Sequence, residues 1–262
     1  MRKFIVAAVQ MDTGNDKNQN LQQMLQYIEE AARRGADLVV FPEVATILSE
    51  AEVHAEPIPG PTTRLLAQKA KDCGIWVHGG SMSEINPNGL RTYNTSVLIN
   101  PAGEIVAKYR KLHNFDMILP DGSSVRESDN KEPGSHIVTV QTELGCLGFA
   151  ICYDMRFPEL FRIMRLQGAE VIFLPANFTL PTGKDHWEPL LRARAIENIC
   201  YVAASNRVGA DEYGTYKGHS VILNPYGQVI ASCNDGEQGS ATAALDDEML
   251  MKIRYMHKLN RM

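Results

Sequence analysis

The sequence lacks the features that would assign it to a membrane, secreted or nucleic-acid-binding class. No apolar run approaches the roughly 20 residues that a membrane-spanning helix needs. The apolar stretch Phe4–Val9 behind the basic N-terminus is too short for a signal-peptide core, and Gln10 ends it. Lys and Arg are scattered and the net charge is −5, so neither nucleic acid nor an anionic membrane is an expected partner.

Cysteine is scarce, and its arrangement excludes two common uses. The chain has five cysteines, an odd number, dispersed and without a Cys-x-x-Cys pair. This pattern argues against a disulfide framework and against a zinc site. It favours a reducing compartment, so we expect the protein to be cytoplasmic. The spacing of the His residues suggests no metal either.

The chain does have enough apolar residues to build a large core. It is 262 residues long and 44% hydrophobic, and no low-complexity or Pro/Ser-rich linker divides it. We therefore expect one domain over residues 1–262. Apolar strand-like runs alternate with amphipathic helical patterns, which predicts an α/β layer structure.

The apolar spacing predicts seven regular elements in the first half. They are strands at Lys3–Gln10, Ala36–Phe41, Ile75–Ser81, Thr95–Asn100 and Glu104–Tyr109, and helices at Asn18–Arg34 and Thr62–Cys73. Gly35 and Gly74 follow the two helices and are expected to end them. The polar segment Asp116–Asn130 shows no regular pattern.

Two segments of the first half recur in the second half. Residues 35–42 (GADLVVFP) match residues 168–175 (GAEVIFLP). Residues 96–103 (SVLINPAG) match residues 220–227 (SVILNPYG). Each match alone is compatible with ordinary buried-strand composition, but together they favour two pseudo-symmetric halves. Two such sheets packed face to face and covered by helices would form a four-layer α-β-β-α sandwich.

Cys152 has the most informative surroundings of any residue in the chain. It follows an apolar, strand-like run, and Pro158 and Glu159 after it read as a first helical turn. A cysteine at a strand-to-helix corner is lifted out of the sheet, with backbone N–H groups pointing at whatever it attacks. This setting suits a nucleophilic thiol, whereas a buried cysteine elsewhere is normally an inert packing residue.

Two charged residues at strand exits are further candidates. Glu43 follows a buried strand, at the edge where open α/β sheets place ligand chemistry. Alternation along its strand puts Lys111 on the same face as Tyr109 and opposite Arg110. A lysine near a thiol and a developing oxyanion would supply a fixed positive charge. The alternatives are a solvated acid for Glu43 and a basic strand edge for Lys111.

Three short motifs then occur in a fixed order: FPE at residues 41–43, YRKLH at 109–113 and CYDMRFPE at 152–159. In this order they resemble the three signature motifs of the nitrilase superfamily of carbon–nitrogen hydrolases. The resemblance extends from AAVQM at residues 7–11 to NPYG at residues 224–227, so it covers nearly the whole chain. The fold that it implies is the same sandwich that the internal repeat suggests.

The resemblance also implies a role for each motif residue. Glu43 would be the general base, Lys111 the oxyanion-stabilising lysine and Cys152 the nucleophile. The amidase branch has a second glutamate in a Phe-x-Glu-Ser pattern before Pro-Gly. Glu127 fits that pattern with Val in place of Phe, although it could also be an ordinary loop acid. The backbone N–H of Tyr153 would join Lys111 in stabilising the oxyanion.

The segment after the second repeated strand is expected to line the substrate pocket. The helix at residues 186–198 resembles the omega-amidase and deaminated-glutathione-amidase branch, whose substrates carry a free carboxylate. Arg156 could bind that carboxylate or, with equal weight, form an ion pair with Asp154 or Glu159. Either Thr182 or Asp185 could cap the helix. The expected substrate-binding residues are Arg156, Asn177, Phe178, Thr179 and Thr182.

These expectations combine into one leading function and two alternatives. The leading function is a cysteine-dependent amidase that hydrolyses the terminal amide of a small carboxylate-bearing molecule through a thioester and releases ammonia. The alternatives are an N-carbamoyl-amine hydrolase of the same superfamily and a catalytically inactive binding homologue. No cofactor is needed. The resemblance implies a homodimer or higher homo-oligomer, although the Arg-rich tail that crosses to the partner in the family is shortened here and ends at Met262.

Overall fold

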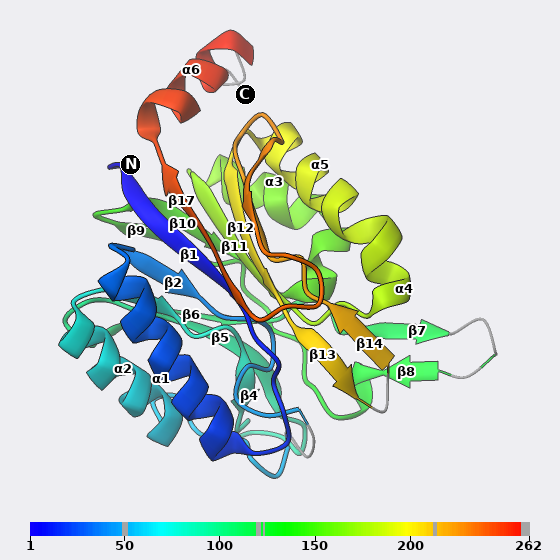
Figure 1. The fold of residues 1–262 in the computed structure, drawn as a ribbon. Coiled ribbons are helices and arrows are strands. Elements are labelled where there is room, and N and C mark those ends of the chain that lie inside the picture. Colours follow the sequence, from blue (N-terminus) through cyan, green and yellow to red (C-terminus); the bar gives the residue numbers. More distant parts are fainter. Residues whose placement is uncertain (49–51, 119–121, 123, 212–213, 258–262) are drawn as a thin grey trace.

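Two β-sheets dominate the structure of the protein, a computed structural model that describes residues 1–48, 52–118, 122, 124–211 and 214–257. The first sheet has seven strands in the order β17-β1-β2-β3-β5-β4, with β6 paired to β5. The second has six strands in the order β16-β15-β12-β11-β10-β9. Helices α1 and α2 cover the outer face of the first sheet, and α3 and α5 cover that of the second (Figure 1). The four-layer arrangement predicted from the sequence is confirmed.

The first sheet is built mainly from the first half of the chain. Its strands and helices are β1 (Phe4–Gln10), α1 (Lys17–Arg33), β2 (Leu38–Val40), α2 (Pro61–Cys73), β3 (Trp76–His78), β4 (Met82–Glu84), β5 (Tyr93–Ile99), β6 (Ile105–Arg110) and β17 (Gly239–Leu245). All seven predicted elements are present, and most ends differ from the prediction by one or two residues. The strand predicted at 75–81 is shorter, because it stops at His78 before two consecutive glycines.

The second sheet is built from the second half. Its strands and helices are β9 (Thr139–Thr142), β10 (Gly145–Phe149), α3 (Pro158–Leu166), β11 (Val171–Ala176), α4 (Leu180–Thr182), α5 (Glu188–Asn198), β12 (Tyr201–Asn206), β15 (Val221–Leu223) and β16 (Val229–Ser232). Outside the two sheets lie the hairpins β7 (Asp116–Ile118) with β8 (Ser124–Arg126) and β13 (Val208–Asp211) with β14 (Gly214–Lys217), and helix α6 (Asp247–His257). The segment that appeared irregular from 116 to 130 thus contains a short hairpin.

The two halves share one strand order. Each has three parallel strands, β1-β2-β3 and β10-β11-β12, followed by two antiparallel ones, β5-β6 and β15-β16. The repeated sequence segments fall on the equivalent strands β2 and β11, and β5 and β15. The pseudo-symmetry expected from those repeats is therefore a property of the fold.

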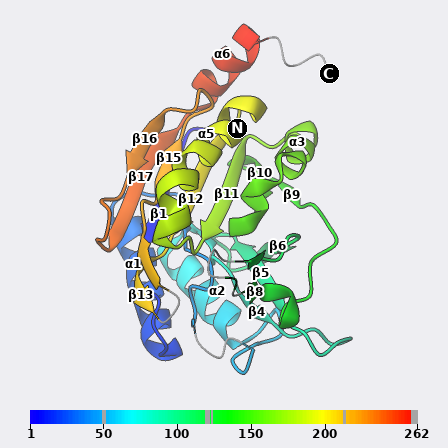
Figure 2. The ribbon, with the colours of Figure 1, turned by 90° about the vertical axis from the view of Figure 1, so that its right-hand side faces the viewer.

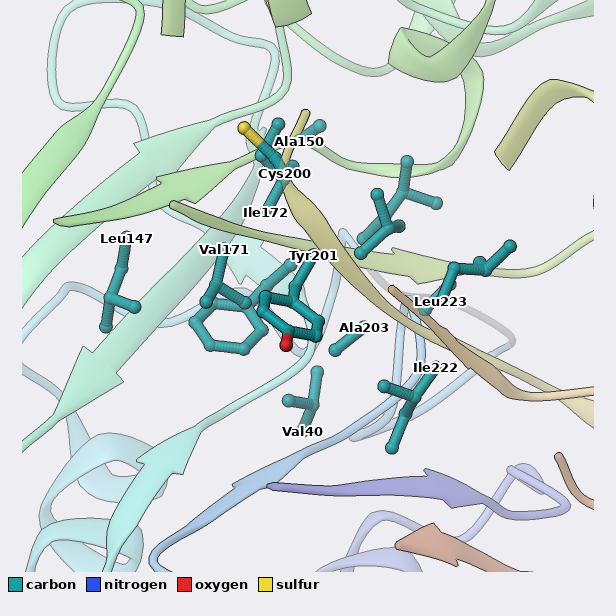
Figure 3. Close-up of a cluster of buried hydrophobic side chains, with 14 of the residues drawn as sticks. Val40, Leu147, Ala150, Val171, Ile172, Cys200, Tyr201, Ala203, Ile222 and Leu223 are labelled. Atoms are coloured by element: carbon teal, nitrogen blue, oxygen red, sulfur yellow. The ribbon is translucent and has the colours of Figure 1, made fainter. Parts of the chain in front are cut away.

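Successive side chains of the central strands face two different apolar layers. In β2, Leu38 and Val40 point between the sheets, whereas Val39 packs toward α1 and α2. Both faces are covered, so the strand shows no polar alternation. Figure 2 views the molecule with α3 and α5 in front of the second sheet, and in Figure 3 Val40 faces Tyr201 and Ala203 of that sheet. The Ser205 hydroxyl also donates to the Val40 carbonyl, 2.8 Å away, which joins the sheets directly.

The start of the helical segment after β11 differs from the prediction. Neither Thr182 nor Asp185 is the N-cap of a helix. The N-cap of α4 is Thr179, and its side chain makes no capping hydrogen bond. Pro181 lies in the first turn of α4, where its fixed φ favours helix initiation, and α4 begins three residues before the start that a Thr182 cap would give. The segment then passes through a π-helical turn at Gly183–Trp187 into α5.

Among the described residues, no helix has the length and apolar character needed to cross a membrane.

Candidate active site

Cys152 lies at the corner that the sequence predicts. Strand β10 ends at Phe149, a 3₁₀ turn covers Cys152–Arg156, and α3 begins at Pro158. The Cys152 backbone has a φ of +47°, an uncommon conformation for a residue other than glycine, which persists only where the surroundings impose it. Its thiol is buried, with 8% of the residue exposed. The strained corner therefore points a cysteine into the protein rather than out to solvent.

A buried carboxylate, Asp154, holds this corner in place. Its Oδ2 accepts hydrogen bonds from the Ile151 N–H at 2.9 Å and from the Tyr109 hydroxyl at 2.6 Å. Its Oδ1 lies 3.0 Å from the His113 backbone nitrogen and 2.7 Å from His113 Nδ1. Asp154 thus links the cysteine corner to the residues on both sides of Lys111. Sequence reasoning considered it only as a partner for Arg156.

The predicted lysine and both predicted glutamates meet in one buried cluster. Lys111 Nζ lies 2.9 Å from Glu43 Oε1 and 2.8 Å from Glu127 Oε2. Lys111 is 2% exposed and Glu43 is 5% exposed. The Phe115 N–H donates to Glu127 Oε2 at 2.7 Å, so the loop after Lys111 fixes the second glutamate. The readings of Glu43 as a solvated acid and of Lys111 as a basic strand edge do not apply.

Cys152 belongs to the same cluster electrostatically. Burial raises the pKa of its thiol well above the ordinary value, and the nearby Glu43 charge and a hydrogen bond to Glu43 add to the rise. Lys111 and a backbone hydrogen bond from Asn177 act in the opposite direction and do not outweigh these effects. The thiol is therefore neutral at rest and needs a base before it can attack.

The charges of the other two members follow from their contacts. Burial would lower the pKa of Lys111, but attraction to Glu127 and Glu43 outweighs it and raises that pKa well above its ordinary value. Burial would raise the pKa of Glu127, yet the Lys111 charge and its hydrogen bond bring that pKa below the ordinary value. The cluster at rest thus has an ammonium beside an ionised Glu127 and a neutral thiol.

The turn after Cys152 contains the Tyr153 N–H that is predicted to join Lys111 in stabilising the oxyanion. Its first hydrogen bond runs from the Asp154 N–H to the Ile151 carbonyl at 3.0 Å. The N–H of Tyr153 lies before this bond and has no partner within the turn. Together with Lys111, this group can stabilise negative charge that forms on an atom bound to the cysteine.

Arg156 lies next to the cluster without a carboxylate partner. No ion pair joins it to Asp154 or Glu159 among the described residues. Its guanidinium carbon lies 5.5 Å from the Tyr153 ring centroid and 5.8 Å from that of Phe178, and its Nη2 is 3.3 Å from His186 Nδ1. Its buried Nε has no hydrogen-bond partner in the described structure. The ion-pair alternative for Arg156 is wrong.

The segment predicted to bind substrate separates the cluster from a neighbouring cavity. Asn177 hydrogen-bonds the cysteine through its backbone, and the Phe178 N–H donates to Asn206 Oδ1 at 3.0 Å. Phe178 and Thr179 also line a cavity of about 220 Å³ with polar and charged walls, which include Lys184. The backbone of Thr182 lies in α4, but its side chain is outside the described part of the structure.

No cluster of three or more His, Cys, Asp or Glu side chains that could hold a metal occurs among the described residues. All five cysteines are free thiols.

Sequence reasoning missed two residues that complete the site, Asp154 and Asn94. Asn94 donates to both glutamates, and its place beside Lys111 on the neighbouring strand follows from sheet register rather than from any motif.

Comparison with known proteins agrees with this geometry. The profile of the carbon–nitrogen hydrolase family matches residues 5–255. Deaminated glutathione amidase of Synechocystis is 38% identical over 97% of this chain and 96% of its own. Omega-amidase NIT2-A of Xenopus laevis is 37% identical over 100% of this chain and 95% of its own.

Solved structures show the same relationship. The NitFhit protein of C. elegans superposes with a TM-score of 0.91 at 32% identity, covering 100% of this chain and 66% of that longer one. Saccharomyces cerevisiae Nit3, of the nitrilase superfamily, superposes with a TM-score of 0.89 at 31% identity, covering 99% of this chain and 96% of its own. The chain belongs to the carbon–nitrogen hydrolase family of the nitrilase superfamily and is a hydrolase of non-peptide carbon–nitrogen bonds.

Proposed function

We propose that the protein is a cysteine-dependent amidase that hydrolyses the terminal amide of a small carboxylate-bearing substrate through a thioester and releases ammonia. The observation that carries this proposal is the buried Lys111 ammonium between Glu43 and Glu127, beside a neutral thiol on a strained corner. Its similarity to an omega-amidase and to deaminated glutathione amidases supports the substrate class.

Acylation begins with the neutral thiol. Glu43 accepts the Cys152 proton as the sulfur attacks the amide carbonyl carbon, and a C–S bond forms. The carbonyl electron pair moves to oxygen, where Lys111 and the Tyr153 N–H stabilise the charge. Loss of one such donor typically slows catalysis about 10²- to 10³-fold. The protonated Glu43 then gives its proton to the nitrogen, the C–N bond breaks, and ammonia leaves a thioester.

Deacylation uses the same base. Glu43 takes a proton from water, whose oxygen attacks the thioester carbonyl while the same donors stabilise the oxyanion. The C–S bond breaks, and Glu43 returns the proton to the Cys152 sulfur. The product is a carboxylic acid, and the thiol is neutral again, as in the resting site.

Arg156 is the proposed partner of the substrate carboxylate. It is a cation flanked by two aromatic rings, with a buried Nε that no described residue satisfies. A planar guanidinium of this kind favours a carboxylate, which can accept two parallel hydrogen bonds from it. Asn177, Phe178, Thr179 and Thr182 complete the proposed binding wall.

Ammonia release from succinamate, α-ketoglutaramate and an N-carbamoyl amine tests the reaction. We expect the wild type to act on the two amides and Cys152→Ala to act on neither. Hydroxylamine should divert the wild-type reaction to a hydroxamate, as a thioester requires. Turnover of the carbamoyl amine alone would establish the carbamoylase instead. No turnover of any of the three by folded protein would establish the inactive homologue.

Butyramide, which lacks the carboxylate of succinamate, tests Arg156. Arg156→Met should raise KM for succinamate about 10- to 100-fold and leave butyramide within about threefold, because a charge-assisted pair contributes about 1.5–3 kcal/mol. Equal effects on both substrates would show that Arg156 only shapes the cavity.

A further inference from the structure

Asn94 is buried in the centre of the catalytic cluster. It lies on β5 next to the end of β6, and its backbone carbonyl accepts the Lys111 N–H at 2.8 Å. Only 3% of the residue is exposed. The strand pairing that positions Lys111 therefore positions Asn94 as well.

The side-chain amide of Asn94 joins the two catalytic carboxylates. Its Nδ2 donates to Glu43 Oε1 at 3.0 Å and to Glu127 Oε1 at 3.2 Å. The opposite amide orientation would place Oδ1 against two carboxylate oxygens, so the two acceptors determine the orientation. In this orientation Oδ1 is buried and has no partner in the described structure. A buried acceptor without a hydrogen-bond partner lowers stability, so the site retains this amide at the expense of stability.

The two donors on Glu43 select the oxygen that does the chemistry. Glu43 Oε1 receives both the Lys111 ammonium and the Asn94 amide. No described nitrogen donates to Oε2, which leaves that oxygen for the thiol proton. A partial turn of the carboxylate about its axis would break both hydrogen bonds, whereas a half turn only exchanges two equivalent oxygens. The amide and the ammonium together therefore fix the base in one orientation.

We propose that Asn94 is a positioning residue for the thiol chemistry: it fixes Glu43 and Glu127 around Lys111 and keeps one Glu43 oxygen directed at Cys152. The inference rests on the proposed roles of Glu43 and Cys152. A neutral donor is required at this place. An aspartate would gather three carboxylates around one ammonium, whereas a lysine would add a second cation and weaken the base.

Asn94→Leu tests the proposal, because it removes both donors without adding charge. We expect kcat/KM to fall about 10- to 100-fold, the effect of losing hydrogen bonds to charged groups, mostly through kcat. The acidic limb of the pH profile should move to higher pH, since the ionised Glu127 loses the Asn94 donor that favours it. Asn94→Ser, which retains one donor, should lie between Leu and the wild type.

Alkylation of Cys152 by iodoacetamide, followed by intact mass, provides a readout that needs no amide substrate. We expect Asn94→Leu to slow it at neutral pH about tenfold and to shift its pH dependence in the same direction. The alkylation experiment still tests the role of Asn94 if the wild type hydrolyses none of the amides offered. Failure of the amidase proposal can therefore be distinguished from failure of the Asn94 proposal.

Asn198→Leu is the matched control. Asn198 is also buried, donates to a backbone carbonyl of α5 at 3.0 Å, and has an unpartnered Oδ1 in the described structure, but it touches neither catalytic glutamate. The Asn198→Leu variant should be less stable than the wild type and should retain the wild-type pH profile. The proposal is overturned if Asn94→Leu and Asn94→Ser, both folded, change neither pH dependence nor alkylation relative to Asn198→Leu. If Asn94→Leu fails to fold, Asn94→Ser alone decides by the same two measurements.

Discussion

The two halves of this protein have one architecture, yet only one set of strand ends carries the proposed catalytic residues. The strand registers align Ala8 beside Val40 in the first half and Phe149 beside Phe173 in the second. Counting three residues on from Ala8 and from Phe149 makes Met11 the counterpart of Cys152. The corner that presents a thiol in the second half therefore presents a buried thioether in the first.

The other catalytic positions have equally inert counterparts. The repeated segments align Glu43 with Ala176 and Lys111 with Asp235. Glu43 and Ala176 even touch, since the Glu43 N–H lies 3.4 Å from the Ala176 carbonyl. The fold thus has two related sets of strand ends, and the identity of a few side chains there decides which set forms the proposed site.

The counterpart of Asn94 has no side chain. It is Gly218, with φ of +75°, and a Cβ there would lie 2.1 Å from the Gln10 side chain. Gln10 fills this space and is held by the backbone carbonyls of Asn234 and Glu237 and by the Ser220 N–H. The second set of strand ends therefore lacks the amide that joins Glu43 and Glu127 in the first.

The largest difference between the halves should come from the lysine position. Lys111→Met should reduce kcat/KM on the order of 10³-fold, because it removes an oxyanion donor and disturbs the base. Unfolding free energy should fall by about 3–5 kcal/mol, because two buried carboxylates lose their cation. Asp235→Asn at the counterpart should stay within about twofold in activity, as expected for an exposed ion pair. Steady-state kinetics and urea unfolding measure both, and equal losses would contradict the comparison.

The next effect concerns the carboxylate that fixes the cysteine corner. Asp154→Asn should lower kcat about 10²-fold with little change in KM, since one acceptor oxygen becomes a donor facing an N–H or a hydroxyl. Tyr109→Phe removes a single donor from the same network and should lose less than tenfold. A kcat unaltered by Asp154→Asn would show that the strained φ of Cys152 needs no such support.

A pH-dependent effect should come from His78, which lies between the two sheets. Its ring stacks on Phe149 at 5.5 Å, and neither nitrogen has a partner in the described structure. Burial lowers the pKa of His78 from 6.5 to about 3. The unfolded chain therefore binds a proton more readily than the folded chain, so this group lowers the unfolding free energy as pH falls from 6.5 toward 3, by roughly 5 kcal/mol in all.

His78→Leu should remove that loss. Its unfolding free energy relative to wild type should increase as pH falls from 6.5 to 4, as measured by urea unfolding at several pH values. A constant difference across this range would show that His78 is protonated in the folded protein.

The smallest effect should occur at Thr13, the first-half counterpart of Asp154. Its hydroxyl is buried and has no partner in the described structure, whereas Asp154 holds four donor contacts. Thr13→Val should change the unfolding free energy by less than about 1 kcal/mol, in the stabilising direction, because the unsatisfied hydroxyl is removed. A clear loss of stability in thermal unfolding would reveal a partner for that hydroxyl.

Much of this site could be read from the sequence because local patterns carry it. The run before Cys152, Pro158 after it and the strand exit at Glu43 each specify backbone geometry within a few residues. The start of the helical segment that leads into α5 was missed, since Pro181 lies in its first turn, ahead of both predicted cap residues, Thr182 and Asp185. Asn94 and Asp154 were missed as site residues, because their partners lie across the sheet or on another element.

The sequence by itself determined the alternation of strands and helices, the duplicated halves and the three residues around which the chemistry is proposed, because apolar period and short motifs are local properties of the chain. Only the tertiary structure decided that both glutamates share one ammonium, that burial keeps the thiol neutral, and that Arg156 has no acidic partner. These outcomes depend on which distant side chains meet in a space without water, and sequence spacing does not encode that distance.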